Sequence, residues 1–404
     1  MTGRGRAVLG LGLAVYVVAW VFGSRALYPV ATGLVAAVAL TVGWVRLSAR
    51  PPRVRRHGAE RDVVEGEDVR IDLVVEPSAR VQPPTLVAHE GLARLGARDV
   101  ELRQGRPGRW VGGYDLRRVP RGRYPFETVQ LSIEDPFGLA RAFLREREAQ
   151  SLVVFPRLVE LRSLFSETGT RLSDGRRLLL RRPAGFELHS VRDHAEGESL
   201  RRVHWPSTAR RGRLMVKELE DAPRDEIAVL LDGDASAVVG TPPDSTFDAA
   251  VRAAGSLLQA HVRRGRRAVL VVNAAARVTQ QIASAGAEWH RALELLAAAE
   301  PTAHASVCSL LDAEAGAVAR SLDLVVVTSR LEPALVERLC RRALSRRGAA
   351  LVYVEPASFA GAAARPEAGL LRLHAAGVPV AVVRRGADLG VALSAAPGVE
   401  AARA

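Results

Sequence analysis

The residues best suited to bind a metal ion follow a short apolar run near the middle of the chain. Leu230 and Leu231 lead into Asp232, Asp234 and Ser236, which alternate with small residues. Carboxylate and hydroxyl oxygens at this two-residue spacing suit a hard cation such as Mg²⁺. The same polar residues also form turns and cap helices, which is the alternative that needs no metal.

The familiar catalytic sequence patterns are missing. There is no G-x-S-x-G, no H-E-x-x-H, no Walker lysine and no G-x-G-x-x-G with an acidic partner. His189, His194 and His204 form the one local group of histidines, and their spacing matches no zinc pattern. Cys308 and Cys340 lie in apolar, helix-like contexts, where cysteine is usually a small buried hydrophobe. We therefore expect a protein that is not an enzyme.

The acidic motif lies where an α/β fold places its binding sites. From residue 226 onward, short apolar runs alternate with helical patterns, which is typical of parallel strands covered on both faces. We expect a doubly wound α/β domain over residues 226–404, whose ligands bind beyond the carboxyl ends of the strands. The expected strands are 227–231, 268–272, 324–327, 350–354 and 379–383, and the expected helices are 247–262, 289–299, 333–344 and 369–376.

Residues 57–160 predict a small β-sandwich. The run from Asp68 to Glu76 alternates polar and apolar residues, as in a half-buried strand. Such a module is more often a spacer or an interaction domain than an enzyme. Further strands are expected at 110–117, 125–133 and 151–155, and residues 161–225 are expected to form a basic connecting segment.

The first 56 residues predict a transmembrane helical hairpin. Uncharged apolar runs occupy residues 7–24 and 26–45, and each is long enough for the roughly 30 Å hydrocarbon core. A secretory signal peptide is the alternative for the first run, but the second run follows at once and no clean cleavage site separates them. Arg25 alone lies between the runs, whereas arginines flank both outer ends. The positive-inside rule thus predicts a multi-pass protein of the inner (plasma) membrane with both termini in the cytoplasm.

The formal charge of +13 comes mainly from two stretches. Residues 1–56 carry +8, and residues 176–217 carry +7. Phe186 and Trp205 are the only aromatic residues of the second stretch, so we expect no nucleic acid partner. Anionic lipid contact and internal pairing with nearby acids both remain open for this stretch.

Several motifs resemble those of the bacterial "domain of unknown function 58" family. The family runs approximately R-x-Y-x-x-G-D, then R-x-I-x-W, then A-R, then a strand ending in K-E, with D-P-F-G-L upstream. Asp135 to Leu139 reads D-P-F-G-L here, and the twin apolar runs match the usual N terminus. The resemblance implies an interaction motif made of Arg192, Gly197, Glu198, Arg201, Trp205 and Arg210.

The resemblance also implies that the α/β domain is similar to a von Willebrand factor A domain. The metal-ion-dependent adhesion site of such domains begins D-x-S-x-S, whereas Asp232, Asp234 and Ser236 read D-x-D-x-S. After the fourth strand, where another aspartate is often placed, this chain has Arg330. Either Asp234 compensates, or Arg330 takes the place of the metal by pairing with an acid. We expect a degenerate site, with Mg²⁺ as its candidate cofactor.

These resemblances imply a membrane-anchored cytosolic adaptor that mediates protein–protein contacts through the loops near Asp232. Family members often accompany MoxR-type AAA+ ATPases, so the expected partner is such an ATPase, in chaperone-like assembly or envelope processes. One alternative is a metal-dependent hydrolase that uses Asp232 and Asp234 with Glu198 or His204. Another is a structural membrane protein of envelope assembly.

Overall fold

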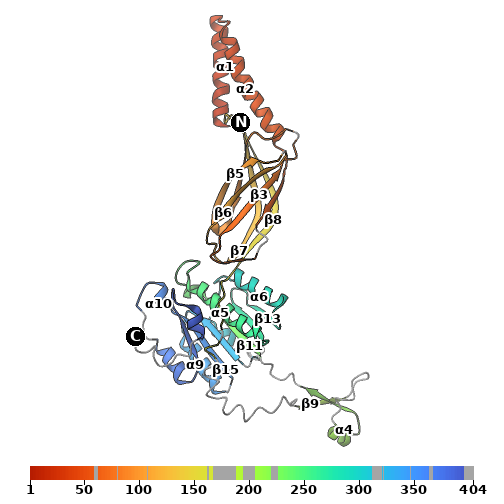
Figure 1. The fold of residues 1–404 in the computed structure, drawn as a ribbon, viewed down its shortest axis with the longest axis vertical. Coiled ribbons are helices and arrows are strands. Elements are labelled where there is room, and N and C mark those ends of the chain that lie inside the picture. The colour runs from red at the N-terminus through yellow and green to blue at the C-terminus, as the bar shows by residue number, and fades with distance from the viewer. Residues whose placement is uncertain are drawn as a thin grey trace. The chain divides into compact units, whose positions relative to one another are not determined.

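A computed structural model divides the chain into two compact units, residues 1–155 and 156–404. The first unit contains a helical hairpin and a β domain, and the second contains an α/β domain (Figure 1). The residues described are 1–58, 62–79, 81–106, 108–161, 163–166, 188–193, 205–219, 226–311, 321, 323–345, 347–363 and 367–394.

Two apolar helices, α1 (Gly3–Phe22) and α2 (Leu27–Ser48), form the hairpin, and both are long and apolar enough to cross a membrane. They pack through small residues, since a β-carbon at Gly12 would lie 3.1 Å from side-chain atoms of both Leu34 and Val35. Buried residues recur every seven positions, as in a left-handed helix pair. They are Gly5, Gly12 and Ala19 in α1, and Ala31, Val38 and Val45 in α2, where Thr41 and Ser48 form a second buried pair seven residues apart.

The β domain is a sandwich-like sheet wrapped around one apolar core, as predicted. Its strand order is β1-β3-β6-β5-β4-β7-β8-β2, and every pair is antiparallel except β2 with β8. Strand β5 pairs with β4 as far as Leu102 and with β6 from Arg103, so one strand serves both layers. The strands are β1 (Arg53–His57), β2 (Val63–Val64), β3 (Val69–Glu76), β4 (Leu86–Gly91), β5 (Ala97–Gln104), β6 (Trp110–Leu116), β7 (Gly122–Glu134) and β8 (Arg141–Phe155).

Arg56, the last of the eight arginines in residues 1–56, is buried inside the β domain and is not exposed beside the predicted membrane spans. Its Nε donates to Glu90 Oε1 at 2.6 Å, and its guanidinium lies 5.3 Å from the centroid of the Phe126 ring. The Tyr114 hydroxyl donates to the other oxygen of Glu90. Burial first, and then this hydrogen bond, raises the pKa of Tyr114 and keeps the hydroxyl a donor. Because a buried ion needs a partner, the pair fixes β1 against β4.

The α/β domain has a six-stranded sheet in the order β13-β12-β11-β14-β15-β16. All strands are parallel except β13 at one edge, and helices cover both faces. This confirms the predicted α/β class. The strands are β11 (Glu226–Asp232), β12 (Arg267–Asn273), β13 (Val278–Ile282), β14 (Asp323–Thr328), β15 (Gly348–Val354) and β16 (Val380–Val383).

Two groups of helices bury the two faces of this sheet. Helices α5 (Thr246–Arg263), α6 (Ala287–Ala298), α10 (Pro356–Phe359) and α12 (Leu389–Ser394) supply the core on one face. Helices α7 (Cys308–Leu311), α9 (Pro333–Leu344) and α11 (Ala368–Ala375) supply it on the other. The expected strands and longer helices are present, whereas the edge strand β13 and the short helices α7, α10 and α12 were not expected.

The segment that follows β8 belongs to the α/β core. Leu161, Leu164 and Phe165 are buried there, and Phe165 N donates to Leu393 O at 2.9 Å. We had instead expected the β domain to extend to residue 160, with the connecting segment beginning at residue 161. The boundary between the two compact units lies between Phe155 and Pro156.

Helix α5 also carries a buried histidine, from which we expect a dependence of stability on pH. His261 is 2% exposed, and neither ring nitrogen has a hydrogen-bond partner among the described residues. Burial, followed by the nearby Arg266 and Arg264, lowers its pKa from 6.5 to about 3. The unfolded chain therefore binds the proton first as pH falls. We expect full stability above the unfolded pKa and a loss of about 2 kcal/mol between pH 7 and pH 5.

Urea unfolding of the detergent-solubilised chain, followed by hydrogen exchange of the α5 amides, measures this loss. His261→Leu should remove the dependence, while His290→Gln, at a half-exposed position on α6, should leave it in place. A His261→Leu chain that weakens as steeply as the unaltered chain would contradict the assignment.

Candidate functional site

The acidic motif lies at the carboxyl end of β11, where the strand order reverses. The chain adds β12 and β13 on one side of β11 and then crosses to β14 on the other side. Such a switch point is where open α/β sheets bind their ligands. Asp232 ends β11, Asn273 ends β12 and Thr328 ends β14, so three polar side chains gather at this edge.

The Asp232 carboxylate ties these three strand ends together. Its Oδ1 accepts from Asn273 Nδ2 at 3.0 Å and from the backbone N–H of Asp234 at 3.2 Å. Its Oδ2 accepts from Thr328 Oγ1 at 2.7 Å. Burial raises the pKa of Asp232, although the hydrogen bonds from Asn273 and Thr328 oppose the shift. Asp232 thus acts as a structural acceptor at the base of the site.

Asp234, Ser236 and Arg330 form a more exposed layer above it. Asp234 Oδ1 accepts from the backbone N–H of Ser236 at 2.9 Å and from its hydroxyl at 2.8 Å. Arg330 Nη1 donates to Asp234 Oδ2 and to Ser236 Oγ, both at 3.1 Å. Burial opposes ionisation of Asp234, but the hydrogen bonds from Ser236 and then Arg330 lower its pKa below the usual value. The Asp234 carboxylate is therefore charged and paired.

Backbone contacts hold the motif loop in place. A β-carbon at Gly233 would lie 2.2 Å from Asn273 O, so only glycine lets the ends of β11 and β12 approach this closely. The carbonyl of Gly233 accepts from Ala303 N at 2.9 Å. On the other side, the Ser329 hydroxyl donates to Ala237 O at 2.9 Å. The loop is thus fixed to both neighbouring loops.

Arg330 also meets a second acid, Glu332, which was not among the expected site residues. Its Nε lies 3.5 Å from Glu332 Oε1, and the Ser306 hydroxyl donates to Glu332 Oε2 at 2.5 Å. Glu332 immediately precedes α9, which starts at Pro333. An acid just before a helix that begins with proline is the sequence pattern that could have pointed to this residue. The guanidinium is held between Asp234 and Glu332, yet its side chain remains 52% exposed.

These contacts do not fit a resident Mg²⁺ in this arrangement. Arg330 Nη1 already lies against Asp234 Oδ2 and Ser236 Oγ, two of the oxygens a cation would need. Both Asp232 oxygens accept hydrogen bonds from protein donors. Within the described ranges, no group of three or more His, Cys, Asp or Glu residues could hold a metal. Of the two arrangements expected, Arg330 paired with an acid is the one present.

The interaction motif implied by the resemblance lies only partly within the described residues. Gly197, Glu198, Arg201 and His204 fall outside them, so their positions stay predictions. Arg192 lies in β9 (Leu188–Asp193), opposite Val216 of β10 (Met215–Leu219), which confirms a strand at Lys217-Glu218. Trp205 begins α4 (Trp205–Arg211) and is 64% exposed; Arg210 of the same helix is also exposed.

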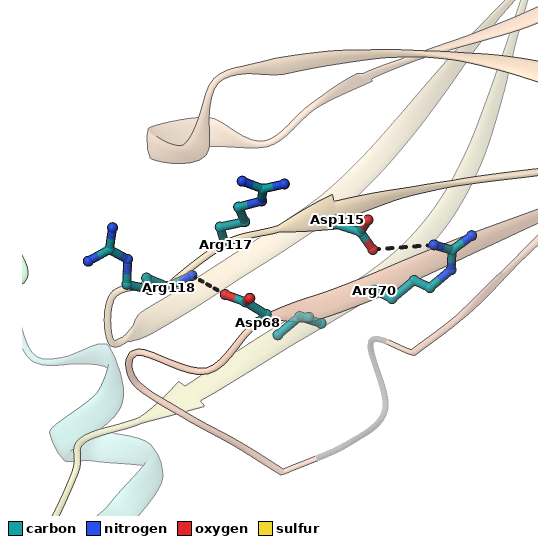
Figure 2. Close-up of a pocket in the computed structure, with 6 residues that line it drawn as sticks. Asp68, Arg70, Asp115, Arg117 and Arg118 are labelled. Carbon is teal, nitrogen blue, oxygen red and sulfur yellow. Dashed lines mark hydrogen bonds and ion pairs between the residues drawn. The ribbon is translucent and has the colours of Figure 1, made fainter.

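The β domain has a separate pocket of about 580 Å³ (Figure 2). The Arg118 backbone N–H donates to Asp68 Oδ1 at 2.8 Å, and Arg70 Nη1 lies 3.4 Å from Asp115 Oδ1. Arg70 and Asp115 are more than half exposed, and ion pairs of this kind contribute little. The pocket contains none of the expected site residues. Its lining is Asp68, Val69, Arg70, Asp115, Arg117 and Arg118.

Comparison with protein families finds a match for part of the chain. Residues 190–376, from β9 to just beyond α11, match the family described as "Protein of unknown function DUF58". This match agrees with the family that the motifs in this part of the chain resemble. A relative is "Uncharacterized protein YeaD" of Bacillus subtilis (strain 168), 25% identical over 157 residues. The alignment spans 39% of this chain and 37% of that protein.

Two solved structures show low similarity. The PKD domain from the human VPS10 domain-containing receptor SorCS2 covers 24% of this chain and 72% of its own, with 21% identity and a TM-score of 0.16. Cwp6 from Clostridium difficile covers 84% of this chain and 38% of its own, with 8% identity and a TM-score of 0.18. At such TM-scores, the description of the fold rests on the strand pairings themselves.

We expect Arg330 to decide whether the site can take a cation, because it binds Asp234 and Ser236. We expect calorimetry with Mg²⁺ or Mn²⁺ to give no binding heat with the unaltered chain. Arg330→Ser frees Asp234 Oδ2 and Ser236 Oγ, so this variant should bind Mg²⁺ measurably.

The matched control is Arg384→Ser. Arg384 is an exposed arginine paired at 3.1 Å with the nearly buried Glu355 in the same domain. This variant should stay silent in the same titration. Equal Mg²⁺ heats from the unaltered chain and from Arg330→Ser would show that Arg330 does not close the site.

Proposed function

We propose that this protein is a membrane-anchored cytosolic adaptor that binds a protein partner through the loops at the carboxyl ends of β11 and β14. One observation carries the proposal: Arg330, half exposed, is held at 3.1 Å from both Asp234 and Ser236. A guanidinium fixed in this way has little conformational freedom left to lose when a partner binds. Its planar N–H donors suit a carboxylate or carbonyl group of that partner. The location at the switch point supports a binding role.

The outer surface of the hairpin supports membrane anchoring. The 18-residue windows that define the two candidate spans are only 17% and 22% buried within the protein. Leu13, Trp20, Phe22 and Leu40 are among the large apolar side chains that point outward. An apolar surface of this extent is unfavourable in water and favourable in lipid. Together with the flanking arginines, it supports a multi-pass plasma-membrane protein with cytoplasmic termini.

For the partner we propose a MoxR-type AAA+ ATPase, acting in chaperone-like assembly or envelope processes. The support is the family resemblance, which includes the D-P-F-G-L motif and the motif around Trp205. The antiparallel edge strand and the acidic motif at the switch point support the likeness of the α/β domain to a von Willebrand factor A domain.

The alternative functions draw less support. A metal-dependent hydrolase would need Asp234 Oδ2 and Ser236 Oγ for its cation, and Arg330 already binds both. A structural protein of envelope assembly would differ from the adaptor only in its partner. The adaptor is therefore the function we put to test.

Affinity purification from detergent-solubilised native membranes tests the proposal. The tagged chain should bring down an AAA+ ATPase, identified by mass spectrometry. Arg330→Glu places a third carboxylate beside Asp234 and Glu332, so we expect recovery of the ATPase to fall by about tenfold, equivalent to losing about 1.4 kcal/mol.

Arg341→Glu makes the same charge change on α9, where Arg341 pairs with Glu337 at an exposed position. This variant should retain the ATPase. The proposal fails if the unaltered chain recovers no AAA+ ATPase, or if both variants recover it equally well.

A further inference from the structure

The β domain contacts the ends of both N-terminal helices through two loops. Thr2, which caps α1, donates its backbone N–H to Leu139 O at 2.9 Å and its hydroxyl to Gly138 O at 2.6 Å. Near the end of α2, Trp44 Nε1 donates to Gln82 O at 2.9 Å. We call residues 81–85, which precede β4, and residues 135–140, between β7 and β8, the hairpin-side loops.

The contact with α1 is close enough to constrain the sequence. A β-carbon at Gly5 would lie 2.2 Å from Leu139 O, so a larger residue could not remain in place. Val45 of α2 is also buried within the β-domain core. The hairpin and this end of the β domain are therefore packed together.

The D-P-F-G-L motif forms the second hairpin-side loop and displays an aromatic side chain. Asp135 is 2% exposed, and its carboxylate accepts from the backbone N–H groups of Phe137 at 3.0 Å and Ala140 at 2.5 Å. Gly138 has a φ of 67°, a left-handed conformation that suits glycine. These contacts fix a turn whose Phe137 side chain is 72% exposed.

The start of α1 sets the depth of this turn in a membrane. The apolar run begins at Ala7, four residues after Gly3, which is about 6 Å along a helix. The polar layer on each side of a bilayer is about 5–8 Å thick. If the hairpin spans the bilayer, the turn that caps α1 therefore lies among the lipid headgroups. Exposed aromatic side chains bind favourably in that layer.

The surroundings of Phe137 also suit lipid. Residues 1–58 contain no acid. A β-carbon at Gly138 would lie 3.4 Å from Glu134 Oε1 and 3.6 Å from Arg4 Nη1, so both side chains lie beside the turn. The Glu134 carboxylate is paired with Arg141. Val81, in the other hairpin-side loop, is a further exposed apolar residue. Thr85 Oγ1 donates to Glu134 O at 2.6 Å and so holds the two loops together.

We propose that the hairpin-side loops dock on the bilayer surface, with Phe137 inserted among the lipid headgroups of the leaflet where α1 begins. Arg4 contacts the lipid phosphates beside it. This inference rests on the proposed membrane anchor and extends it from the helices to the β domain. It gives the D-P-F-G-L motif a role, which is to present Phe137 to lipid while it caps α1.

Depth-dependent fluorescence quenching tests the proposal. Cys308→Ala and Cys340→Ala remove the native thiols from the full chain. Single substitutions Phe137→Cys, Leu40→Cys and Arg117→Cys then each carry an environment-sensitive dye. The chains are reconstituted in phosphatidylcholine–phosphatidylglycerol nanodiscs that contain lipids with a nitroxide at the headgroup or along the acyl chain.

Each position reports on a different part of the unit. Leu40 is an outward-facing residue of α2, and its dye should be quenched by acyl-chain nitroxides. Arg117 lines the pocket (Figure 2). It follows the end of β6 that lies away from Trp110, and Trp110 pairs with Val75 near the end of β3. The strands place it about 20 Å from those loops. We expect headgroup nitroxides to quench the dye at position 137 at least about threefold more strongly than the dye at position 117.

The outcomes separate this inference from the proposed function. Quenching at position 40 with equal quenching at 137 and 117 would overturn the docking of the loops and leave the membrane anchor intact. No quenching at position 40 would overturn the anchor and the inference together. A dye at position 137 that is shielded in native membranes but unquenched in nanodiscs would show that a protein covers the turn, which also overturns the inference.

Discussion

One buried carboxylate, that of Asp232, determines the arrangement of the α/β site. It accepts hydrogen bonds from Asn273 and Thr328 and thereby joins the ends of β11, β12 and β14. A buried carboxylate without such donors would be strongly destabilising, so the three strand ends must stay together. The loop that follows then presents Asp234 beside Arg330. The ion pair at the surface of the site depends on the hydrogen bonds beneath it.

In the first unit too, buried polar groups hold backbone segments in close contact. Asp135 folds the turn after β7, and that turn accepts hydrogen bonds from Thr2 at the start of α1. Because Gly5 has no side chain, α1 can approach the backbone of this turn at Leu139. Arg56 and Glu90 neutralise each other inside the β domain. Both apolar helices are therefore attached to the same end of the β domain. If the helices span a bilayer, we expect that end to contact lipid.

Much of this architecture could be predicted from the sequence, because burial leaves periodic patterns. Continuous apolar runs identified the strands that helices cover on both faces, and the position of Asp232 after the first of them identified the site. The edge strand β13 was missed because its polar residues, such as Gln280 and Gln281, carry no such pattern. Glu332 was missed because its role depends on where Arg330 folds back. The burial of Arg56 was missed because its partner, Glu90, is distant in the sequence.

The central claim is that the carboxyl-edge loops around Arg330 contact a protein partner. Photo-crosslinking in native membranes tests it most directly, with p-benzoylphenylalanine at Ala235, an exposed residue of the motif loop, and at Leu344, at the end of α9 on the opposite edge of the sheet. The account predicts a crosslink to an AAA+ ATPase from position 235 that disappears with Arg330→Glu, and none from position 344. Crosslinks to the ATPase from position 344 alone, or equally from both positions, would contradict it.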